Sequence, residues 1–383
     1  MRRPHLVLAG GVLFVFLLGS NALAADGFAR QTTGGAGGTP VDVNTASAFK
    51  SAVESTSTYI VQVSGTIDLG SVGGAVQIRS NKTIIGVTAG AKIIGRLGFR
   101  DNASNVIIEK LIITNPHAGD TYDGISVHDA ITNLFVTKCT IYDCGDGGID
   151  ITKESDYITV SWCKFYYTTS PPDPNHRFVN LIGADDGDTG DAGKLHVTMH
   201  HNWWGSRCKE RMPRVRFGQV HLYNNFYYTL SDNYCIGVGN NSQIRLESSH
   251  FEAVISAWAD KRTNGVGIIG WNSDNRFVGT AIPNWAPNDY PVFPPPYSYI
   301  LNAGTTVKTM VQTYAGAETP DPPHWLYLPY GDFTHNIQVD VYDLEKFADY
   351  WLDTTDIWDA DYFNNSIIDG REFALFAQNW MKP

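Results

Sequence analysis

The sequence has few cysteines, no long apolar run outside its N-terminus and little helical periodicity, and each shortage narrows the class of protein. Five cysteines are an odd number, so an exported chain keeps at least one thiol free or pairs it with another molecule. No run after residue 24 reaches the roughly 18 to 20 apolar residues of a membrane span. Amphipathic helical patterns are scarce before residue 340, whereas 37 Gly, 19 Tyr and 18 Phe favour a strand-rich fold with many turns.

The first 24 residues have the pattern of an export signal. An arginine pair precedes an apolar run that ends at Leu18, and small residues follow at Ala22 and Ala24. A signal peptidase reads small residues at such positions, and the apolar run is too short for a comfortable membrane span. We therefore expect a signal peptide over residues 1–24 and a secreted mature protein, whether extracellular, periplasmic or on the cell surface.

Pairs of apolar residues two positions apart recur along the middle of the chain. The pairs are Val106 and Ile108, Leu134 and Val136, Ile158 and Val160, Val197 and Met199, Val220 and Leu222, and Ile244 and Leu246. They follow one another at steps of 28, 24, 39, 23 and 24 residues. Alternation of this kind is typical of a strand with one buried face. A strand unit that recurs without an intervening helix predicts an all-β, right-handed parallel β-helix over residues 25–317, each coil stacked on the one before.

Small side chains recur three residues after each of the last five pairs, where the chain is expected to bend. These residues are Cys139, Cys163, Asn202, Asn225 and Ser249. Stacked at one bend, they would hydrogen-bond one another and satisfy buried backbone groups, which a β-sandwich would not explain. Cys139 and Cys163 either form a disulfide or stack as two small buried side chains. The step of 39 residues predicts an insertion over 166–194 that leaves the coil as one long, functional loop.

Five cations lie close together in a chain whose formal net charge is -11. They are Arg207, Lys209, Arg211, Arg214 and Arg216. The local charge opposes the global one and indicates an anionic ligand, the alternative being a solvated loop. Pro213 lies inside the run, and its fixed φ sets the directions of the neighbouring arginines. That stiffness favours a binding site.

Three carboxylates upstream of the cations predict a calcium site. Asp146 and Asp150 are four residues apart, which on an extended strand places both on one face, and Asp123 lies one coil earlier. Three hard oxygen donors suit Ca²⁺ with coordination positions left for a substrate, and a set without His or Cys argues against a transition metal. The alternative is that these Asp and Gly residues only form turns.

The segments around these residues resemble the pectate lyases of polysaccharide lyase family one. The resemblance rests on DGGIDITKESDYITVS, on KLHVTMHHNWWGSRCKERMPRVRFGQVHLYNN with its RxPxxR run, on GFARQTTGGAGG and on SNKTIIGVTAGAKIIG, and covers roughly residues 26–317. It implies β-elimination in α-1,4-linked polygalacturonate, giving unsaturated oligogalacturonides. It further implies that Asp123, Asp146 and Asp150 hold calcium, which acidifies the proton on C5 of the bound uronate.

The same resemblance implies roles for the arginines. Arg211 corresponds to the base that removes the C5 proton, and Arg216 to a residue that grips a substrate carboxylate. Guanidinium normally stays protonated; if hydroxide is the base, Arg211 would instead stabilise the enolate-like intermediate. Family members usually carry a substrate-binding lysine shortly before an LIG triplet, and here Arg177 is the nearest cation and the expected replacement, unless it merely faces water.

A second departure concerns the family's VWIDH-like signature, which is eroded here to the residues LFVTK at 134–138. Because all three aspartates are kept, the unesterified polymer is favoured over the methyl ester that pectin lyases cleave. Two further alternatives remain. One is a β-helical glycoside hydrolase with a carboxylate pair such as Asp185 and Asp186, although adjacent residues on a strand point to opposite faces. The other is a non-catalytic β-helix that only binds acidic glycan.

The C-terminal residues 337–383 follow a linker over 318–336 and contain an internal duplication. Leu344, Phe347, Ala348 and Trp351 match Phe373, Phe376, Ala377 and Trp380, each 29 residues later. Both sets have the spacing of amphipathic helices. The duplication resembles a dockerin-like, EF-hand-like module, although Ile337 and Ser366 stand where the calcium loops prefer glycine. We expect either an anchor for a cohesin-like or cell-surface partner or a degenerate packing tail, on a monomeric protein with no nucleic-acid partner.

Overall fold

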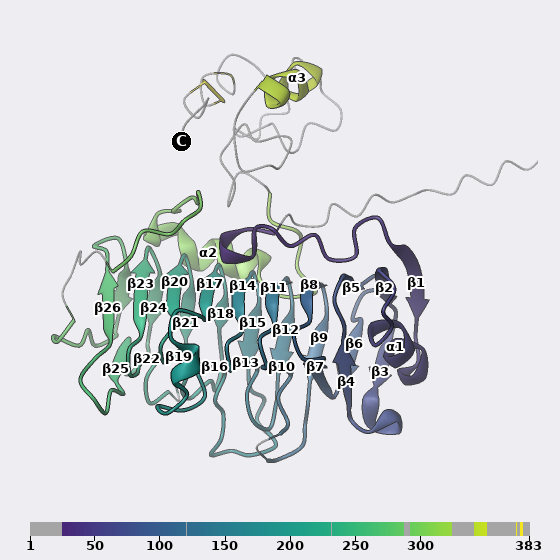
Figure 1. Ribbon diagram of the computed structural model, residues 1–383. Helices are drawn as coiled ribbons and strands as arrows, with labels where there is room; N and C mark the ends of the chain where they lie inside the picture. Colours follow the sequence, from purple (N-terminus) through teal and green to yellow (C-terminus); the bar gives the residue numbers. More distant parts are fainter. Residues whose placement is uncertain are drawn as a thin grey trace, which may run out of the picture.

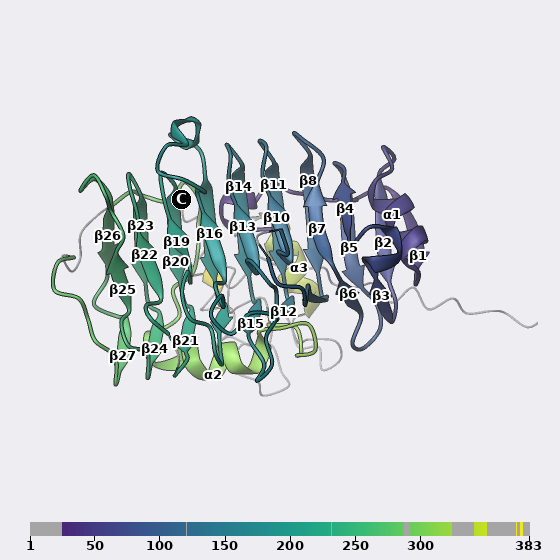
Figure 2. The same cartoon turned by 90° about the horizontal axis from the view of Figure 1, so that it is seen from below.

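The described chain is a parallel β-helix with three sheets. The structure, a computed structural model, describes residues 25–119, 121–230, 232–286, 292–323 and 341–350 together with Phe373, Phe376 and Ala377. Every strand pairing in it is parallel, and successive coils add one strand to each of three sheets of ten, nine and eight strands. Figure 1 and Figure 2 show the strands stacked side by side along the solenoid. The predicted right-handed parallel β-helix is therefore confirmed.

The strands of each sheet follow chain order. Sheet A contains β1 (Thr39–Val43), β2 (Tyr59–Val63), β5 (Lys82–Gly86), β8 (Ser104–Glu109), β11 (Thr132–Thr137), β14 (Asp156–Ser161), β17 (His196–His200), β20 (Gln219–Tyr223), β23 (Gln243–Glu247) and β26 (Ile268–Trp271). Sheet B contains β3 (Thr66–Asp68), β6 (Lys92–Ile94), β9 (Ile112–Thr114), β12 (Thr140–Tyr142), β15 (Lys164–Tyr166), β18 (Trp203–Trp204), β21 (Phe226–Tyr228), β24 (His250–Glu252) and β27 (Arg276–Val278). Sheet C contains β4 (Ala75–Ile78), β7 (Arg96–Phe99), β10 (Ile125–Val127), β13 (Ile149–Ile151), β16 (Asn180–Ile182), β19 (Arg214–Val215), β22 (Ile236–Val238) and β25 (Trp258–Asp260).

The recurring apolar pairs all lie in sheet A and stack in register. Leu134 pairs with Val106 on one side and with Ile158 on the other, and the same alignment continues to β23. All twelve side chains are buried. Burying a Val, Leu or Ile side chain contributes about 1.5 to 3 kcal/mol, and in-register stacking repeats that contribution on every coil. The spacing of the apolar pairs in the sequence thus corresponds to one coil of the buried core.

Side chains at the bend after sheet A form the predicted ladder. The amide N–H of Cys163 donates to Oδ1 of Asn202 at 3.0 Å, and that of Asn202 to Oδ1 of Asn225 at 2.9 Å. The amide of Asn225 donates in turn to Oγ of Ser249 at 3.1 Å. Asn202, Asn225 and Ser249 thus each satisfy a buried backbone donor on the neighbouring coil, as buried backbone requires.

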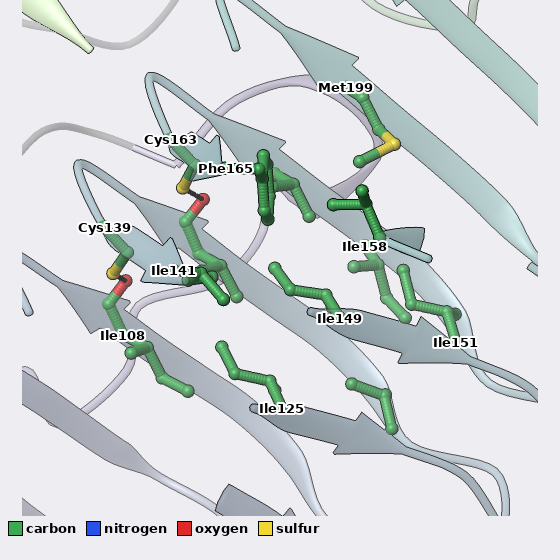
Figure 3. Packing of buried hydrophobic residues seen from close by; sticks show 14 of the residues in the cluster. Ile108, Ile125, Cys139, Ile141, Ile149, Ile151, Ile158, Cys163, Phe165 and Met199 are labelled. Atoms are coloured by element: carbon green, nitrogen blue, oxygen red, sulfur yellow. Dashed lines mark hydrogen bonds between the residues drawn. The ribbon is translucent and has the colours of Figure 1, made fainter. Parts of the chain in front are cut away.

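The five cysteines, all in the described part of the chain, are buried and form no disulfide. Cys139 and Cys163 stack beside the isoleucines of the core (Figure 3). Each Sγ donates to a backbone carbonyl at 3.8 Å, that of Ile108 for Cys139 and that of Val136 for Cys163. Of the two alternatives, the pair of small buried side chains is correct.

The insertion over 166–194 is not one loop, which corrects the prediction. Its middle, Asn180–Ile182, pairs with β13 and β19 and so adds a strand to sheet C. Two loops, 167–179 and 183–195, leave the coil on either side of it. Alternation is hard to detect in a three-residue strand, whereas a parallel sheet gains backbone hydrogen bonds on both edges of even so short a segment.

Two helices were not predicted, because neither is strongly periodic in the sequence. Helix α1 (Ala46–Val53) begins after Thr45, whose Oγ1 accepts the N–H of Ala48 at 3.3 Å. Helix α2 (Gly304–Tyr314) packs Val307 and Val311 against Phe226 of sheet B. The other named helical segments of the described chain are the 3-10 turns η1 (Gly27–Ala29), η2 (Leu69–Val72) and η3 (Thr189–Asp191) and helix α3 (Val341–Tyr350). No helix among the described residues is long and apolar enough to cross a membrane.

The C-terminal duplication is described only in part. Helix α3 forms over the first apolar set, and the ring of its buried Phe347 lies 5.2 Å from that of Phe376, which is helical and also buried. Phe347 and Phe376, one matched pair of the duplication, therefore pack on each other. The predicted signal peptide over 1–24, most of the predicted linker, Ile337, Trp351, Ser366 and Trp380 lie outside the described residues.

Candidate active site

The three predicted aspartates meet at the turns that lead from sheet B into sheet C. Asp123 precedes β10, Asp146 precedes β13, and Asp150 is the middle residue of β13. One carboxylate oxygen from each lies within 4.8 Å of those of the other two. The prediction that Asp123 joins the pair from one coil earlier is confirmed. The spacing argument for Asp146 and Asp150 is wrong in detail, because Asp146 lies in a bend rather than on the strand.

Glycine makes this convergence sterically possible. A Cβ at Gly147 would lie 2.2 Å from Oδ1 of Asp150, and a Cβ at Gly145 would lie 1.6 Å from the carbonyl oxygen of His117. Neither contact is tolerable, so any side chain would move the turn or the carboxylate. The amide N–H of Gly147 also donates to Oδ1 of Asp123 at 3.0 Å. The DGGID segment is therefore shaped around two carboxylates from different coils.

Without a counter-ion the carboxylates repel one another. Burial raises the pKa of Asp123 to about 6, and the nearby charge of Asp146 adds to the effect. The pKa of Asp150 is raised well above its ordinary range by burial and then by Asp123 and Asp146, while Arg211 opposes the rise. A bound cation would offset the repulsion between the converging carboxylates and so favour their ionised form. The oxygen-only donor set suits a hard divalent ion such as calcium.

Arg211 lies two coils beyond the strand that holds Asp150. Asn180 and Leu181 of β16 stand between them: the N–H of Asn180 donates to the Arg211 carbonyl at 2.7 Å, and the N–H of Leu181 donates to Oδ1 of Asp150 at 3.0 Å. Arg211 has a φ of 61°, a left-handed conformation that costs a non-glycine residue about 1 to 3 kcal/mol. The carboxylates and Arg211 therefore belong to one face of the solenoid.

An aromatic pair borders Arg211, and sequence reasoning missed both of its members. The Arg211 guanidinium lies 4.5 Å from the ring centroid of Phe178, and its Nε is buried without a hydrogen-bond partner among the described residues. The ring centroids of Phe178 and His176 are 4.1 Å apart, and Nε2 of His176 lies 3.2 Å from Oδ1 of Asp146. The only available signal was their position in the loop beside Arg177.

Arg216 and Arg177, the other two predicted binding residues, have different surroundings. Arg216 is buried: its Nε donates to Oδ1 of Asp186 at 2.7 Å, and its Nη1 donates to the carbonyls of Gly183 and Ala184 at 2.8 and 2.9 Å. Much of its guanidinium therefore holds the loop after β16. Arg177 is half-buried, its Nε lacks a partner among the described residues, and its carbonyl accepts the N–H of Lys209 at 2.9 Å.

The carboxylate pair considered for a hydrolase is not arranged as an acid and a base. Asp186 accepts hydrogen bonds from Arg216 and from Oγ1 of Thr263, the latter at 2.8 Å. Burial opposes its ionisation, but these hydrogen bonds prevail and lower its pKa. Asp185 caps its own turn by accepting the N–H of Gly187 at 2.9 Å. A general acid needs a raised pKa, so the pair gives the hydrolase alternative no support.

Comparison with known proteins identifies the family. A family model described as pectate lyase matches residues 3–319, and the chain belongs to that family. It is 37% identical over 205 residues to a pectate trisaccharide-lyase of Thermotoga maritima, an alignment that covers 51% of this chain and 53% of that protein. It is 33% identical over 305 residues to pectate lyase E of Dickeya chrysanthemi, covering 64% of this chain and 76% of that protein. The chain thus spans about half the length of the Thermotoga relative.

Solved structures agree on the fold. A Bacillus subtilis pectate lyase variant superposes with a TM-score of 0.66 at 22% identity, covering 77% of this chain and 97% of the other. A Xanthomonas campestris pectate lyase variant gives a TM-score of 0.57 at 28% identity, covering 76% and 98%. The predicted family is confirmed, together with the architecture that positions the carboxylates.

Proposed function

We propose that this protein is a calcium-dependent pectate lyase that cleaves α-1,4-linked polygalacturonate by β-elimination and releases unsaturated oligogalacturonides. One observation carries the proposal: three carboxylates converge within 4.8 Å, and the arginine of the RxPxxR run lies on the same face, separated from Asp150 by one strand. Family membership and the names of the relatives support the same reaction.

Asp123, Asp146 and Asp150 would hold the calcium ion. Calcium held by these residues would supply Lewis-acid assistance, because a divalent charge next to a uronate carboxylate makes the proton on C5 more acidic. The chain fixes two of the three ligands through backbone amides, that of Gly147 for Asp123 and that of Leu181 for Asp150. Such amides keep the carboxylates in place between turnovers, so little reorganisation is needed when the ion and substrate bind.

Arg211 would act at the C5 proton, either as the base or as the group that stabilises the enolate-like intermediate while hydroxide takes the proton. Its guanidinium lies over Phe178 and is near enough to Asp150 to oppose the rise in the pKa of that carboxylate. Arg216 would bind a substrate carboxylate with the part of its guanidinium that Asp186 leaves uncommitted. Arg177 would take the place of the family's substrate-binding lysine.

We further propose that the protein is secreted and acts on pectin outside the cytoplasm. The support is the export pattern of residues 1–24 and the nature of the substrate, a polymer too large to enter cells intact. For the C-terminal residues we propose a dockerin-like module that docks on a cohesin-like or cell-surface partner. Its support is the packing of Phe347 on Phe376, which joins the two copies of the duplicated sequence.

The decisive experiment follows ultraviolet absorbance during incubation with polygalacturonate, with and without a chelator. Elimination leaves a conjugated double bond that absorbs, whereas hydrolysis does not. We expect absorbance to rise in calcium and to stop rising on chelation. Arg211→Lys should lose nearly all activity, whereas Arg207→Lys, an exposed member of the same cation cluster, should keep it. A flat trace in excess calcium would refute the lyase, and an active Arg211→Lys would favour a different base.

A further inference from the structure

The outward face of sheet C continues past the candidate active site for two more coils. Arg214 of β19 pairs with Gly237 of β22, which pairs with Ala259 of β25. Val215, Val238 and Asp260 are the next aligned row and end their strands. The strands end at this row, and Asp260 is exposed whereas Val215 and Val238 are buried, so the residues that follow are placed by their own contacts. They are Arg216, Gly239 and Lys261.

Glycine on the middle coil lets the two arginines lie across it. A Cβ at Gly237 would lie 2.9 Å from Cγ of Arg214, and a Cβ at Gly239 would lie 3.0 Å from Cγ of Arg216. The stem of Arg214 therefore passes beside Gly237 of β22, and the stem of Arg216 passes beside Gly239 before its guanidinium turns back to the loop after β16. Any larger residue at either glycine would push these stems away from the sheet. The coil of β22 therefore leaves room through its two glycines, whereas the coil of β19 carries Arg214 and the coil of β25 carries Lys261.

Tyr234 links Arg214 to the next cation along the solenoid. The Nζ atom of Lys261 lies 4.4 Å from the centroid of the Tyr234 ring. Cε2 of the same ring would lie 3.0 Å from a Cβ at Gly237, next to the stem of Arg214. Tyr234 is buried, so its ring is a fixed support. Arg214, Tyr234 and Lys261 thus form one continuous strip, which we call the cationic strip.

Apart from the contact of Lys261 with the Tyr234 ring, the charges of the cationic strip have no hydrogen-bond or ion-pair partner within the described chain. Neither the guanidinium of Arg214 nor the ammonium of Lys261 makes a hydrogen bond or an ion pair there, and the buried Nε of Arg214 is unsatisfied. Arg216 differs, since Asp186 and two carbonyls occupy it. The bordering carboxylates are engaged elsewhere: Glu210 accepts from Asn233 at 2.6 Å, and Asp260 pairs with Arg262 at 2.6 Å.

An anionic polymer with one charge per sugar fits this arrangement. Neighbouring strands lie about 4.8 Å apart, close to the length of one sugar unit, so a uronate chain lying along the solenoid would present about one carboxylate per coil. We propose that the cationic strip is an extended subsite, in which Arg214 and Lys261 bind carboxylates of sugar units beyond those at the calcium cluster. This inference rests on the proposed function and specifies how far along the solenoid the enzyme holds its substrate.

The test measures kcat/KM in calcium on oligogalacturonates of increasing length, from the shortest that is cleaved to the polymer. We expect Lys261→Met to lose about tenfold on long chains, because one charge-assisted hydrogen bond is missing, and nothing on the shortest. Methionine keeps the apolar stem over Tyr234. Arg214→Gln should show its loss at a shorter chain length than Lys261→Met, because Arg214 lies two coils nearer the calcium cluster. Lys261→Arg, which keeps the charge, should be as active on long chains as wild type. Lys50→Met on the distant helix α1 is the matched control and should also behave as wild type.

A binding measurement gives a second readout. In the Arg211→Lys background, calorimetry with a long oligomer should show the same loss of affinity for Lys261→Met as the kinetics show. Equal kcat/KM for Lys261→Met and wild type at every chain length overturns the subsite, and so does an equal loss on the shortest oligomer. A wild type that cleaves none of the oligomers removes the proposed function itself, so the two failures are distinguishable.

Discussion

The guanidinium of Arg211 lies over the ring of Phe178, 4.5 Å from its centroid. The carbonyl of Phe178 accepts a hydrogen bond from the Tyr167 hydroxyl at 2.6 Å, and its backbone bridges to Glu210, the residue before Arg211. The backbone of Phe178 is thus held by two contacts, which place its ring beside Arg211. A cation over an aromatic face is stabilised by roughly 0.5 to 2 kcal/mol, which here fixes the direction of the side chain that meets the substrate.

Phe178 should therefore position Arg211. We expect Phe178→Leu, which keeps apolar bulk but lacks a π face, to lower kcat about tenfold with KM nearly unchanged. Phe178→Tyr should restore kcat, since it keeps the ring. Steady-state kinetics on polygalacturonate measure both. A leucine variant as fast as wild type would show that the ring does not orient the arginine.

Calcium should stabilise the folded protein through the aspartate cluster. At a concentration one hundred times its dissociation constant, a ligand of the native state adds about 2.7 kcal/mol, visible as a rise in Tm. Asp150→Asn should abolish that rise. In chelator the same variant should be no less stable than wild type, because one of three repelling charges is gone. The exposed Asp101→Asn serves as control and should respond to calcium as wild type does; a normal calcium response in Asp150→Asn would exclude it as a ligand.

Buried Glu109 should make stability fall as pH rises. Both of its carboxylate oxygens lack hydrogen-bond partners in the described chain, and burial raises its pKa from 4.5 to about 7. The native state therefore keeps a proton that the unfolded chain releases, so stability is lost between about pH 4.5 and 7 and the total loss is about 3 kcal/mol. Glu109→Gln should remove this slope in chemical denaturation, whereas the exposed Glu154→Gln should leave it unchanged. An unaltered slope in Glu109→Gln would assign it to other groups.

The bend ladder should be costly to interrupt. Nδ2 of Asn225 donates to the Met199 carbonyl at 2.8 Å, and its Oδ1 accepts the N–H of Asn202 at 2.9 Å. Asn225→Ala leaves both buried groups unsatisfied, so the free energy of unfolding should fall by about 3 kcal/mol. Denaturant titration measures the change, with the exposed Asn175→Ala as the matched substitution. A change below about 1 kcal/mol would mean that water replaces the side chain.

The sequence predicted those parts of the site that repeat or that sit at fixed offsets from a repeat. Asp123 could be placed beside Asp150 because Asp123 precedes β10 and Asp150 lies in β13, and these two strands are equivalent and pair in consecutive coils. The offset from Asp146 to Asp150 was misread as a strand, because the two glycines between them permit a bend that no period reveals. Phe178 and His176 were missed since they lie in a loop of irregular sequence.

Helix α2 shows a different limit of sequence reasoning. Its residues, GTTVKTMVQTY, are rich in β-branched side chains that disfavour helix. Packing of Val307 and Val311 on sheet B outweighs that preference. Likewise, nothing in the RxPxxR run shows that Arg216 would be occupied by Asp186 while Arg214 would have no partner among the described residues.

By itself the sequence determined the solenoid, its coil length and the set of carboxylates and arginines that share one face, because stacking identical positions in register turns a period in the chain into a period in space. Only the tertiary structure decided which of those charges already have a partner within the protein. Ion pairs such as that of Arg216 with Asp186 involve loops that lie outside the repeating strand units. The tertiary structure also decided the contact of Arg211 with Phe178 and the cationic strip, because both depend on how irregular turns direct side chains from neighbouring coils toward one another.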